Sequence, residues 1–209
     1  MCGRYTLRKF PGIEGIDVGT LVSEWNHLNR YNVAPTQRMP VLRWTGEPEA
    51  TELAWGIRAK WQKETDRPLI NARSETAATK PTFKTAVARR RCLVPADGFY
   101  EWKRDLKPAQ PYYFHLENEA PFWFAGIWEN DAYLILTTRP NALIEPIHDR
   151  MPVILDERNA AAWLGNTPLE KDPYANLCSP YPADRMAWRE VNRKVNNARY
   201  DGPECVEAG

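Results

Sequence analysis

Five short stretches of the sequence combine ionisable and polar side chains in patterns that could support chemistry. An active site needs a nucleophile, a proton carrier and groups that orient or neutralise an anion, and each stretch supplies at least one of these. Taken singly, each pattern also occurs in plain core or surface segments. The stretches are CGRY at 2–5, YNVAPTQ at 31–37, INARSET at 70–76, GFYEW at 98–102 and IHDRMPVIL at 147–155.

Cys2 directly follows the initiator methionine. If Met1 is removed, residue 2 carries a free α-amine beside its thiol. An α-amine has a pKa of about 7.7–8.0 against about 10.4 for lysine, so far more of it is neutral and nucleophilic near pH 7. Such an amine can attack an aldehyde, and the thiol can then close a five-membered thiazolidine ring. The alternative is that Cys2 is an ordinary small residue entering a first strand.

Glu101 and His148 are the candidate proton carriers. Glu101 lies between Tyr100 and Trp102 in a strand-like run, where burial would raise its pKa and let it move protons near neutral pH. His148 could act as a general acid or base, or donate to a developing oxyanion. The plain alternatives are a solvated strand carboxylate and a histidine satisfied structurally at a helix end.

Asn71, Arg73 and Glu75 alternate along the chain, so on a strand all three would face one side. The amide could orient a reacting group and the arginine could grip a phosphate with two hydrogen bonds. A turn with a local ion pair is the alternative.

Basic residues also gather over 84–104, a pattern typical of a single-stranded nucleic-acid groove or of a solvated face.

Composition restricts the class of protein. The 209 residues, 43% hydrophobic and 26% charged, suit one globular domain over 1–209, with a tail after about residue 203 that is ordered only in part. A net charge of +1 gives no strong overall attraction to nucleic acid but allows a local basic groove. Four cysteines without a CxxC pair and three histidines without ligand spacing argue against a metal site. With no apolar run long enough to span a membrane and no secretory signal, we expect a cytoplasmic protein.

The hydrophobic pattern predicts more strands than helices. We expect helices over 19–29, 81–91 and 157–164, a helical turn over 141–148, and strands over 39–44, 51–57, 92–102, 111–117, 122–128, 133–138, 151–155 and 186–191. Short helices lie among the strands without strict alternation. This order favours an α+β fold with a mainly antiparallel, partly closed sheet over a doubly wound parallel one.

Read together, the stretches resemble the SOS-response-associated peptidase (SRAP) family of abasic-site processing proteins. MCGRY, YNVAPTQ, AWGIRAKW, INARSETA, GFYEWK, IHDRMPVIL and DGPECVE are similar to the family's motifs and occur in its order across nearly the whole chain. The resemblance implies a compact α+β SRAP domain with a β-barrel-like core and peripheral short helices. It also implies recognition of abasic sites in single-stranded DNA, including single-strand/double-strand junctions, as part of the response to DNA damage.

The resemblance assigns four catalytic residues. Cys2 would form the covalent thiazolidine cross-link with the ring-opened sugar aldehyde after autoproteolytic removal of Met1. Asn71 would hold the reacting centre and polarise the sugar oxygen. Glu101 would pass protons to open the sugar ring and help reverse the cross-link. His148 would protonate or orient the leaving and ring oxygens, and lyase activity would accompany this chemistry.

The resemblance also implies a DNA-binding surface, no cofactor and no metal. Arginines would bind phosphates beside the lesion, a threonine would act as a neutral donor, the 31–37 loop would meet the DNA, and a tryptophan would stack on a neighbouring base. We expect a monomer that associates with the nucleoid on damaged DNA and binds no membrane. The residues are Arg4, Asn32, Pro35, Trp61, Arg73, Thr137 and Arg150.

Two other functions remain open from the residues. An N-terminal-nucleophile peptidase or amidohydrolase would use Cys2 to attack an amide carbonyl, with its own amine as base. A non-covalent single-stranded DNA-binding module would bind intact DNA with an affinity that falls steeply with salt.

Overall fold

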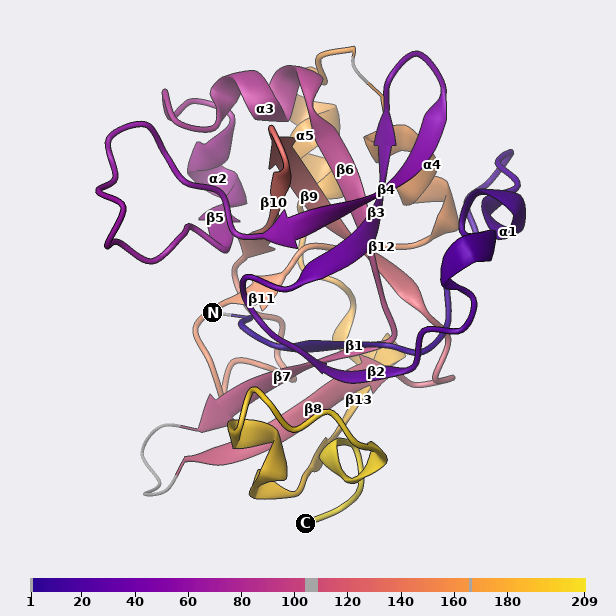
Figure 1. The fold of residues 1–209 in the computed structure, drawn as a ribbon, viewed down its shortest axis with the longest axis vertical. Coiled ribbons are helices and arrows are strands. Elements are labelled where there is room, and N and C mark those ends of the chain that lie inside the picture. Colours follow the sequence, from indigo (N-terminus) through magenta and orange to yellow (C-terminus); the bar gives the residue numbers. More distant parts are fainter. Residues whose placement is uncertain (1, 104–108, 166) are drawn as a thin grey trace.

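A computed structural model describes residues 2–103, 109–165 and 167–209. In Figure 1, two β-sheets lie one above the other, short helices surround the upper sheet, and the N-terminal end of the chain lies between them. The larger sheet contains β11 (Met151–Pro152), β10 (Ala132–Thr138), β4 (Pro48–Trp55), β3 (Arg38–Trp44), β6 (Arg91–Ala96), β9 (Phe122–Glu129), β12 (Ile154–Leu155) and β5 (Asn71–Arg73).

The larger sheet closes on itself. Its strands follow the order β10-β4-β3-β6-β9, and β9 pairs again with β10 along Ala132↔Glu129 to Ile135↔Gly126. This ring confirms the predicted barrel-like core. Most strand pairs are antiparallel, as expected, but β10 pairs in parallel with both β4 and β5.

The smaller sheet carries the first residues of the chain. Its order is β13 (Met186–Glu190), β8 (Gln110–Leu116), β7 (Gly98–Lys103), β1 (Tyr5–Leu7) and β2 (Arg30–Val33). Alternation along β7 places Phe99 among the side chains packed between the two sheets, and Glu101 shares that face. Tyr100 and Trp102 face the other way, against the C-terminal segment.

The helices are short and peripheral. Their apolar side chains pack with the outer face of the ring, where Trp163 of α4 joins Leu93 and Trp123. The α-helices among the described residues are α1 (Val18–Leu21), α2 (Ser74–Ala77), α3 (Lys84–Arg89), α4 (Glu157–Trp163) and α5 (Lys171–Leu177), and the 3₁₀-helices are η1 (Ser23–Trp25), η2 (Ala183–Arg185), η3 (Arg193–Asn196) and η4 (Pro203–Cys205). No helix in the described ranges is long and apolar enough to cross a membrane.

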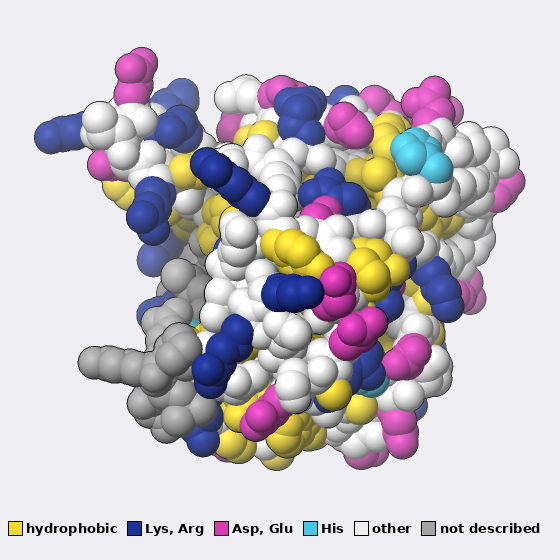
Figure 2. Space-filling model, turned by 60° about the horizontal axis from the view of Figure 1, so that its bottom comes forward, with side chains coloured by type: hydrophobic (Ala, Val, Ile, Leu, Met, Phe, Trp, Pro, Cys, Tyr) yellow, Lys and Arg dark blue, Asp and Glu magenta, His cyan; other side chains and the backbone are white. Residues whose placement is uncertain are grey.

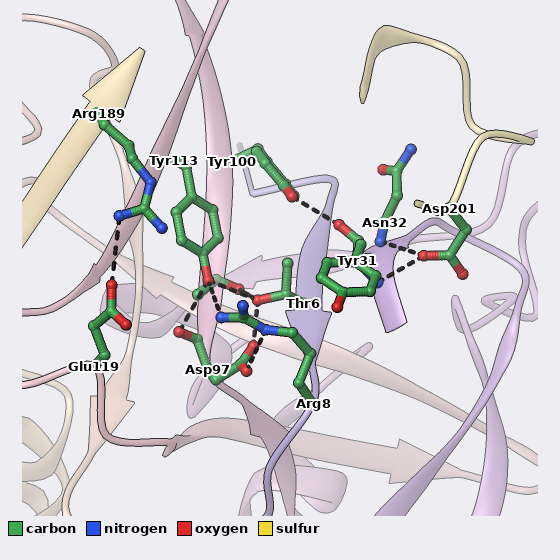
Figure 3. Close-up of polar contacts among 11 residues, drawn as sticks. Thr6, Arg8, Tyr31, Asn32, Asp97, Tyr100, Tyr113, Glu119, Arg189 and Asp201 are labelled. Carbon is green, nitrogen blue, oxygen red and sulfur yellow. Dashed lines mark hydrogen bonds and ion pairs between the residues drawn. The ribbon is translucent and has the colours of Figure 1, made fainter. Parts of the chain in front are cut away.

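The strand predicted over 92–102 is two strands in two sheets. The chain changes sheet at Asp97, which is buried and accepts hydrogen bonds from the Thr6 hydroxyl and from Arg8 (Figure 3). The next residue, Gly98, leaves no room for a side chain, because a Cβ there would lie 2.1 Å from the Tyr113 hydroxyl. The polar network among these residues therefore fixes the crossing between the sheets.

The helical turn expected over 141–148 is present, since the Glu145 N–H bonds the Asn141 carbonyl and the His148 N–H bonds the Ile144 carbonyl. Two other expectations differ from the structure. The helix over 19–29 is split into α1 and η1, and the strand over 151–155 is divided between β11 and β12. Val153 causes that division, because its N–H bonds β10 and its C=O bonds β9. The end of the chain is packed beyond residue 203, since Cys205 and Val206 are buried against the smaller sheet.

Candidate functional site

Cys2 is buried between the two sheets. Its carbonyl oxygen accepts a 2.8 Å hydrogen bond from Asn71 Nδ2, and its thiol points to the Arg4 carbonyl oxygen at 3.7 Å. The Tyr100 N–H also bonds the Arg4 carbonyl, so strand β7 runs directly beside this N-terminal segment. The sequence therefore places Cys2 next to Glu101 by pairing β1 with β7.

Asn71 reaches Cys2 from the other sheet. It begins β5, a three-residue strand held on β10 by the Ile135↔Asn71 pair. Its amide oxygen Oδ1 is buried and makes no hydrogen bond with any residue that the structure describes. One end of the amide therefore fixes the Cys2 backbone, and the other end is able to accept a hydrogen bond from a bound group.

Glu101 lies beside Cys2 and is the candidate acid–base group. Its side chain is 2% exposed, and its Oε2 lies 3.8 Å from His148 Nε2. Burial raises the pKa of the Cys2 thiol far above its usual value, and the nearby charge of Glu101 raises it further. The thiol is therefore protonated at neutral pH.

His148 lies at the end of the 141–148 turns and is mostly buried. Its Nδ1 accepts a hydrogen bond from the Arg150 backbone N–H at 3.0 Å. The same nitrogen lies 3.0 Å from Asp149 Oδ1. A neutral ring that accepts at Nδ1 carries its proton on Nε2, which faces Glu101.

The three predicted phosphate-binding arginines have different surroundings. Arg4 donates to Asn32 Oδ1 and to the Val195 carbonyl, and Arg150 forms a two-pronged ion pair with Glu75. Arg73 is exposed, and no ion pair or side-chain hydrogen bond joins it to another part of the described chain. Of these three arginines, Arg73 therefore has the most accessible guanidinium group.

Two predicted DNA-contacting side chains are inside the protein. Asn32 is fully buried, and its Nδ2 donates to the carbonyls of Val195, Asn197 and Tyr200. Thr137 is also fully buried, and its hydroxyl lies near the Ala72 carbonyl and the Arg150 guanidinium. Their direct contact with DNA stays a prediction, and the structure shows them holding neighbouring backbone and side chains.

Pro35 and Trp61 border two separate grooves. The groove at Pro35, about 460 Å³, runs past the backbone of Gly3 and is lined by Gly3, Arg4, Pro35, Trp102, Ala109 and Asn196. The groove at Trp61, about 500 Å³, lies between the 57–61 segment and α3. Trp61 is 69% exposed, so its ring is accessible for stacking.

The structure thus brings Cys2, Asn71, Glu101 and His148 together from four separate segments. The sequence did not predict Trp102 as a site residue, but the structure places it in the groove that passes Gly3. Alternation along β7 correctly put Trp102 on the face opposite Glu101, and that was the available signal. Glu75 does not share a strand face with Asn71 and Arg73, because β5 ends at Arg73 and α2 begins at Ser74.

On the described part of the face shown in Figure 2, charged residues do not form one continuous positive surface. On the face in Figure 2, Lys and Arg side chains are interspersed with Asp and Glu side chains, as a net charge of +1 suggests. Binding of a polyanion by this protein would therefore depend on particular residues near the grooves rather than on a general field.

Comparisons with known proteins identify the family of the chain. The family model described as "SOS response associated peptidase (SRAP)" matches residues 1–198. The chain is 38% identical to the abasic site processing protein YoqW of Bacillus subtilis, over all of both chains. It is 31% identical to the abasic site processing protein YedK of Escherichia coli, over 86% of this chain and 85% of the relative.

Solved structures share the fold. A protein from Bacteroides thetaiotaomicron superimposes with a TM-score of 0.79 at 24% identity, over all of both chains. A phage-related protein from Bordetella bronchiseptica gives a TM-score of 0.70 at 28% identity, over 91% of this chain and 94% of the other. The chain therefore belongs to the SOS response associated peptidase (SRAP) family.

Proposed function

We propose that this protein captures abasic sites in single-stranded DNA as a covalent thiazolidine cross-link through Cys2, after removal of Met1. The convergence of Asn71 and Glu101 on Cys2 is the observation that carries the proposal. The names of relatives at 31–38% identity, which are called abasic site processing proteins, support the choice of substrate.

The buried thiol favours an order of steps in which the amine reacts first. Since the pKa of the Cys2 thiol is raised, little thiolate is present at neutral pH. The neutral α-amine adds to the C1′ aldehyde, and the carbinolamine loses water to give an imine. The thiol then adds across the C=N bond: sulfur bonds to C1′ and the thiol proton ends on nitrogen. No oxidant or cofactor is required.

The neighbouring side chains suit these proton transfers. Glu101 would take and return protons during sugar-ring opening, carbinolamine dehydration and thiol addition, because its carboxylate is buried beside Cys2. His148 Nε2 would stabilise that carboxylate or protonate a departing oxygen. Asn71 would hold the Cys2 backbone and accept a hydrogen bond from the carbinolamine hydroxyl. The same steps in reverse would release the DNA, and lyase activity would use the same imine.

DNA would lie in the Pro35 groove, which passes Gly3 next to Cys2, and would extend to the separate groove at Trp61. Arg73 offers an exposed guanidinium for a phosphate beside the lesion. Arg4 and Arg150 would reach phosphates from their existing pairs, and Pro35 and Trp61 would contact neighbouring nucleotides. Asn32 and Thr137 would contribute chiefly by fixing Arg4 and Arg150, with which they share contacts.

Denaturing electrophoresis tests the proposal. Protein shown by intact mass to begin at Cys2 is mixed with single-stranded DNA that carries one abasic site, and intact DNA and Cys2→Ala serve as controls. We expect a shifted band that requires both the lesion and Cys2. If no such band forms, the proposal fails; cleavage of peptides in trans would then indicate a peptidase, and salt-sensitive binding of intact DNA a non-covalent module.

A further inference from the structure

His148 Nδ1 faces two groups that require opposite states of the ring. The Arg150 backbone N–H is a donor, so the nitrogen must accept. Asp149 Oδ1 is an acceptor at the same 3.0 Å distance, so a bond to it requires a proton on Nδ1. A neutral ring can satisfy only one of these partners at a time. The position of the Arg150 N–H therefore decides which nitrogen of the neutral ring carries the proton.

The Arg150 side chain holds that N–H in place. Its guanidinium pairs with both oxygens of Glu75, at 2.7 and 2.8 Å, and donates to the Thr137 carbonyl at 2.6 Å. Thr137 belongs to β10 of the closed ring and Glu75 to α2, so the 148–150 segment is attached to two different elements. The hydrogen bonds from Arg150 lower the pKa of Glu75, which keeps its carboxylate charged at neutral pH.

The geometry of the Glu75–Arg150 ion pair suits a role in positioning the Arg150 side chain. It has the two-pronged geometry that fixes an arginine side chain in orientation as well as in place. The Arg150 side chain is 11% exposed, whereas Glu75 is 48% exposed. The acid can therefore be changed without opening a buried cavity.

We propose that Glu75 is a positioning residue that, through Arg150, keeps His148 in the tautomer with its proton on Nε2, toward Glu101. Without Glu75, Arg150 keeps only its contacts to Thr137, and its backbone N–H loosens. The His148 ring then carries its proton on Nδ1 and donates a hydrogen bond to Asp149 Oδ1. The Nε2 lone pair would face the Glu101 carboxylate 3.8 Å away, an unfavourable pairing of two acceptors. The tautomer is a property of the free protein, while its effect on cross-linking rests on the proposed function.

The tautomer can be measured without DNA. Two-bond ¹H–¹⁵N correlation spectra distinguish protonated from unprotonated ring nitrogens. The chain has three histidines, so the spectrum contains few signals. The signals that disappear in His27→Gln and in His115→Gln belong to those residues, and the remaining ones belong to His148. At a pH where the ring is neutral, we expect His148 of the unmodified protein to be protonated on Nε2. In Glu75→Ala we expect a shift toward Nδ1–H, and in Glu75→Gln a smaller shift.

A matched control and a rescue sharpen the test. Glu49 forms a similar two-pronged pair with Arg43 on the β3–β4 hairpin, so Glu49→Ala should leave His148 unchanged. Asp149→Asn replaces the competing acceptor with a side chain that can donate to Nδ1. The double variant Glu75→Ala/Asp149→Asn should therefore recover the Nε2–H tautomer.

Cross-linking rates complete the experiment. We expect Glu75→Ala to slow formation of the cross-link about tenfold at saturating DNA. This is a small part of the rate enhancement of about 10²–10⁴-fold that acid–base groups contribute. The double variant should recover most of the rate. An unchanged His148 tautomer in Glu75→Ala overturns the proposal, as does faster trapping, which would make Glu75 a competitor of the DNA phosphate. If the tautomer shifts but the unmodified protein forms no cross-link, the proposed function fails and the positioning role stands.

Discussion

Asn71→Ala is the substitution that most directly tests how the site is assembled. It removes the 2.8 Å hydrogen bond to the Cys2 carbonyl and the buried Oδ1 together. The first bond is worth about 1 kcal/mol net. A hydrogen bond made only in the transition state, from the carbinolamine hydroxyl to Oδ1, would contribute about 2 kcal/mol more.

The bond to the Cys2 carbonyl is present both before the reaction and in the transition state, so only the second contribution lowers the rate. A loss of about 2 kcal/mol corresponds to a rate reduced roughly 30-fold, since about 1.4 kcal/mol is a factor of ten. Single-turnover cross-linking at saturating abasic DNA, followed on denaturing gels, measures this rate. Non-covalent affinity, measured with DNA that carries a reduced abasic site without an aldehyde, should change little. Asn71→Asp provides a second variant of nearly equal shape, whose carboxylate would repel the Cys2 carbonyl and Glu101.

A rate within about twofold of the unmodified protein for both variants would refute this reasoning. Asn71 would then only support the backbone, and its free oxygen would play no part in the reaction. A loss of binding to the reduced site as large as the loss of rate would also contradict it, because Asn71 would then act in the ground state.

Three further predictions concern stability. Arg91 is buried and donates hydrogen bonds to four carbonyls near the ends of α3 and α4. We expect Arg91→Met to lower the free energy of unfolding by about 3–5 kcal/mol, measured by urea denaturation. A loss below about 1 kcal/mol would contradict this. Thr36→Gly should raise the free energy of unfolding by about 1 kcal/mol, because Thr36 has a φ of 74°; a lower urea midpoint would show that Thr36 is not strained. Burial raises the pKa of the Cys2, Cys92 and Cys178 thiols, that of Cys178 to about 12, so above about pH 9 the unfolded chain loses protons that the folded chain keeps. Stability should therefore fall as pH rises past about 9, by up to about 1.4 kcal/mol per pH unit for each thiol, and a urea midpoint that stays level would contradict this.

Nearly continuous apolar runs predicted the longer strands well. Residues 111–117, 122–128 and 133–138 match β8, β9 and β10 because each carries enough apolar side chains to show its pattern. The break at Asp97 was missed because both β6 and the start of β7 are buried on both faces, which leaves no change of period. β1 and β5 are three residues long, too short for any periodic signal.

The candidate site was found from the sequence through its resemblance to a family. Residue types alone left Cys2, Glu101 and His148 with plausible structural explanations, since their proximity depends on pairing between distant strands. The partnership of Glu75 with Arg150 joins residues 75 positions apart, and no local pattern carries that information. The sequence instead suggested that Glu75 lay beside Arg73, because alternation was extended past the end of β5.

The two ends of the chain are joined at the site. Arg4 donates to the Val195 carbonyl, 191 residues away, and Asp201 accepts from the backbone N–H groups of Tyr31 and Asn32 (Figure 3). Contacts this distant in sequence form only when nearly the whole chain is available. During synthesis, therefore, Cys2 leaves the ribosome long before the residues that surround it have folded. We expect an emerging chain that lacks residues 195–201 to be inert toward an abasic aldehyde, so that the proposed capture begins only after these residues have joined the fold.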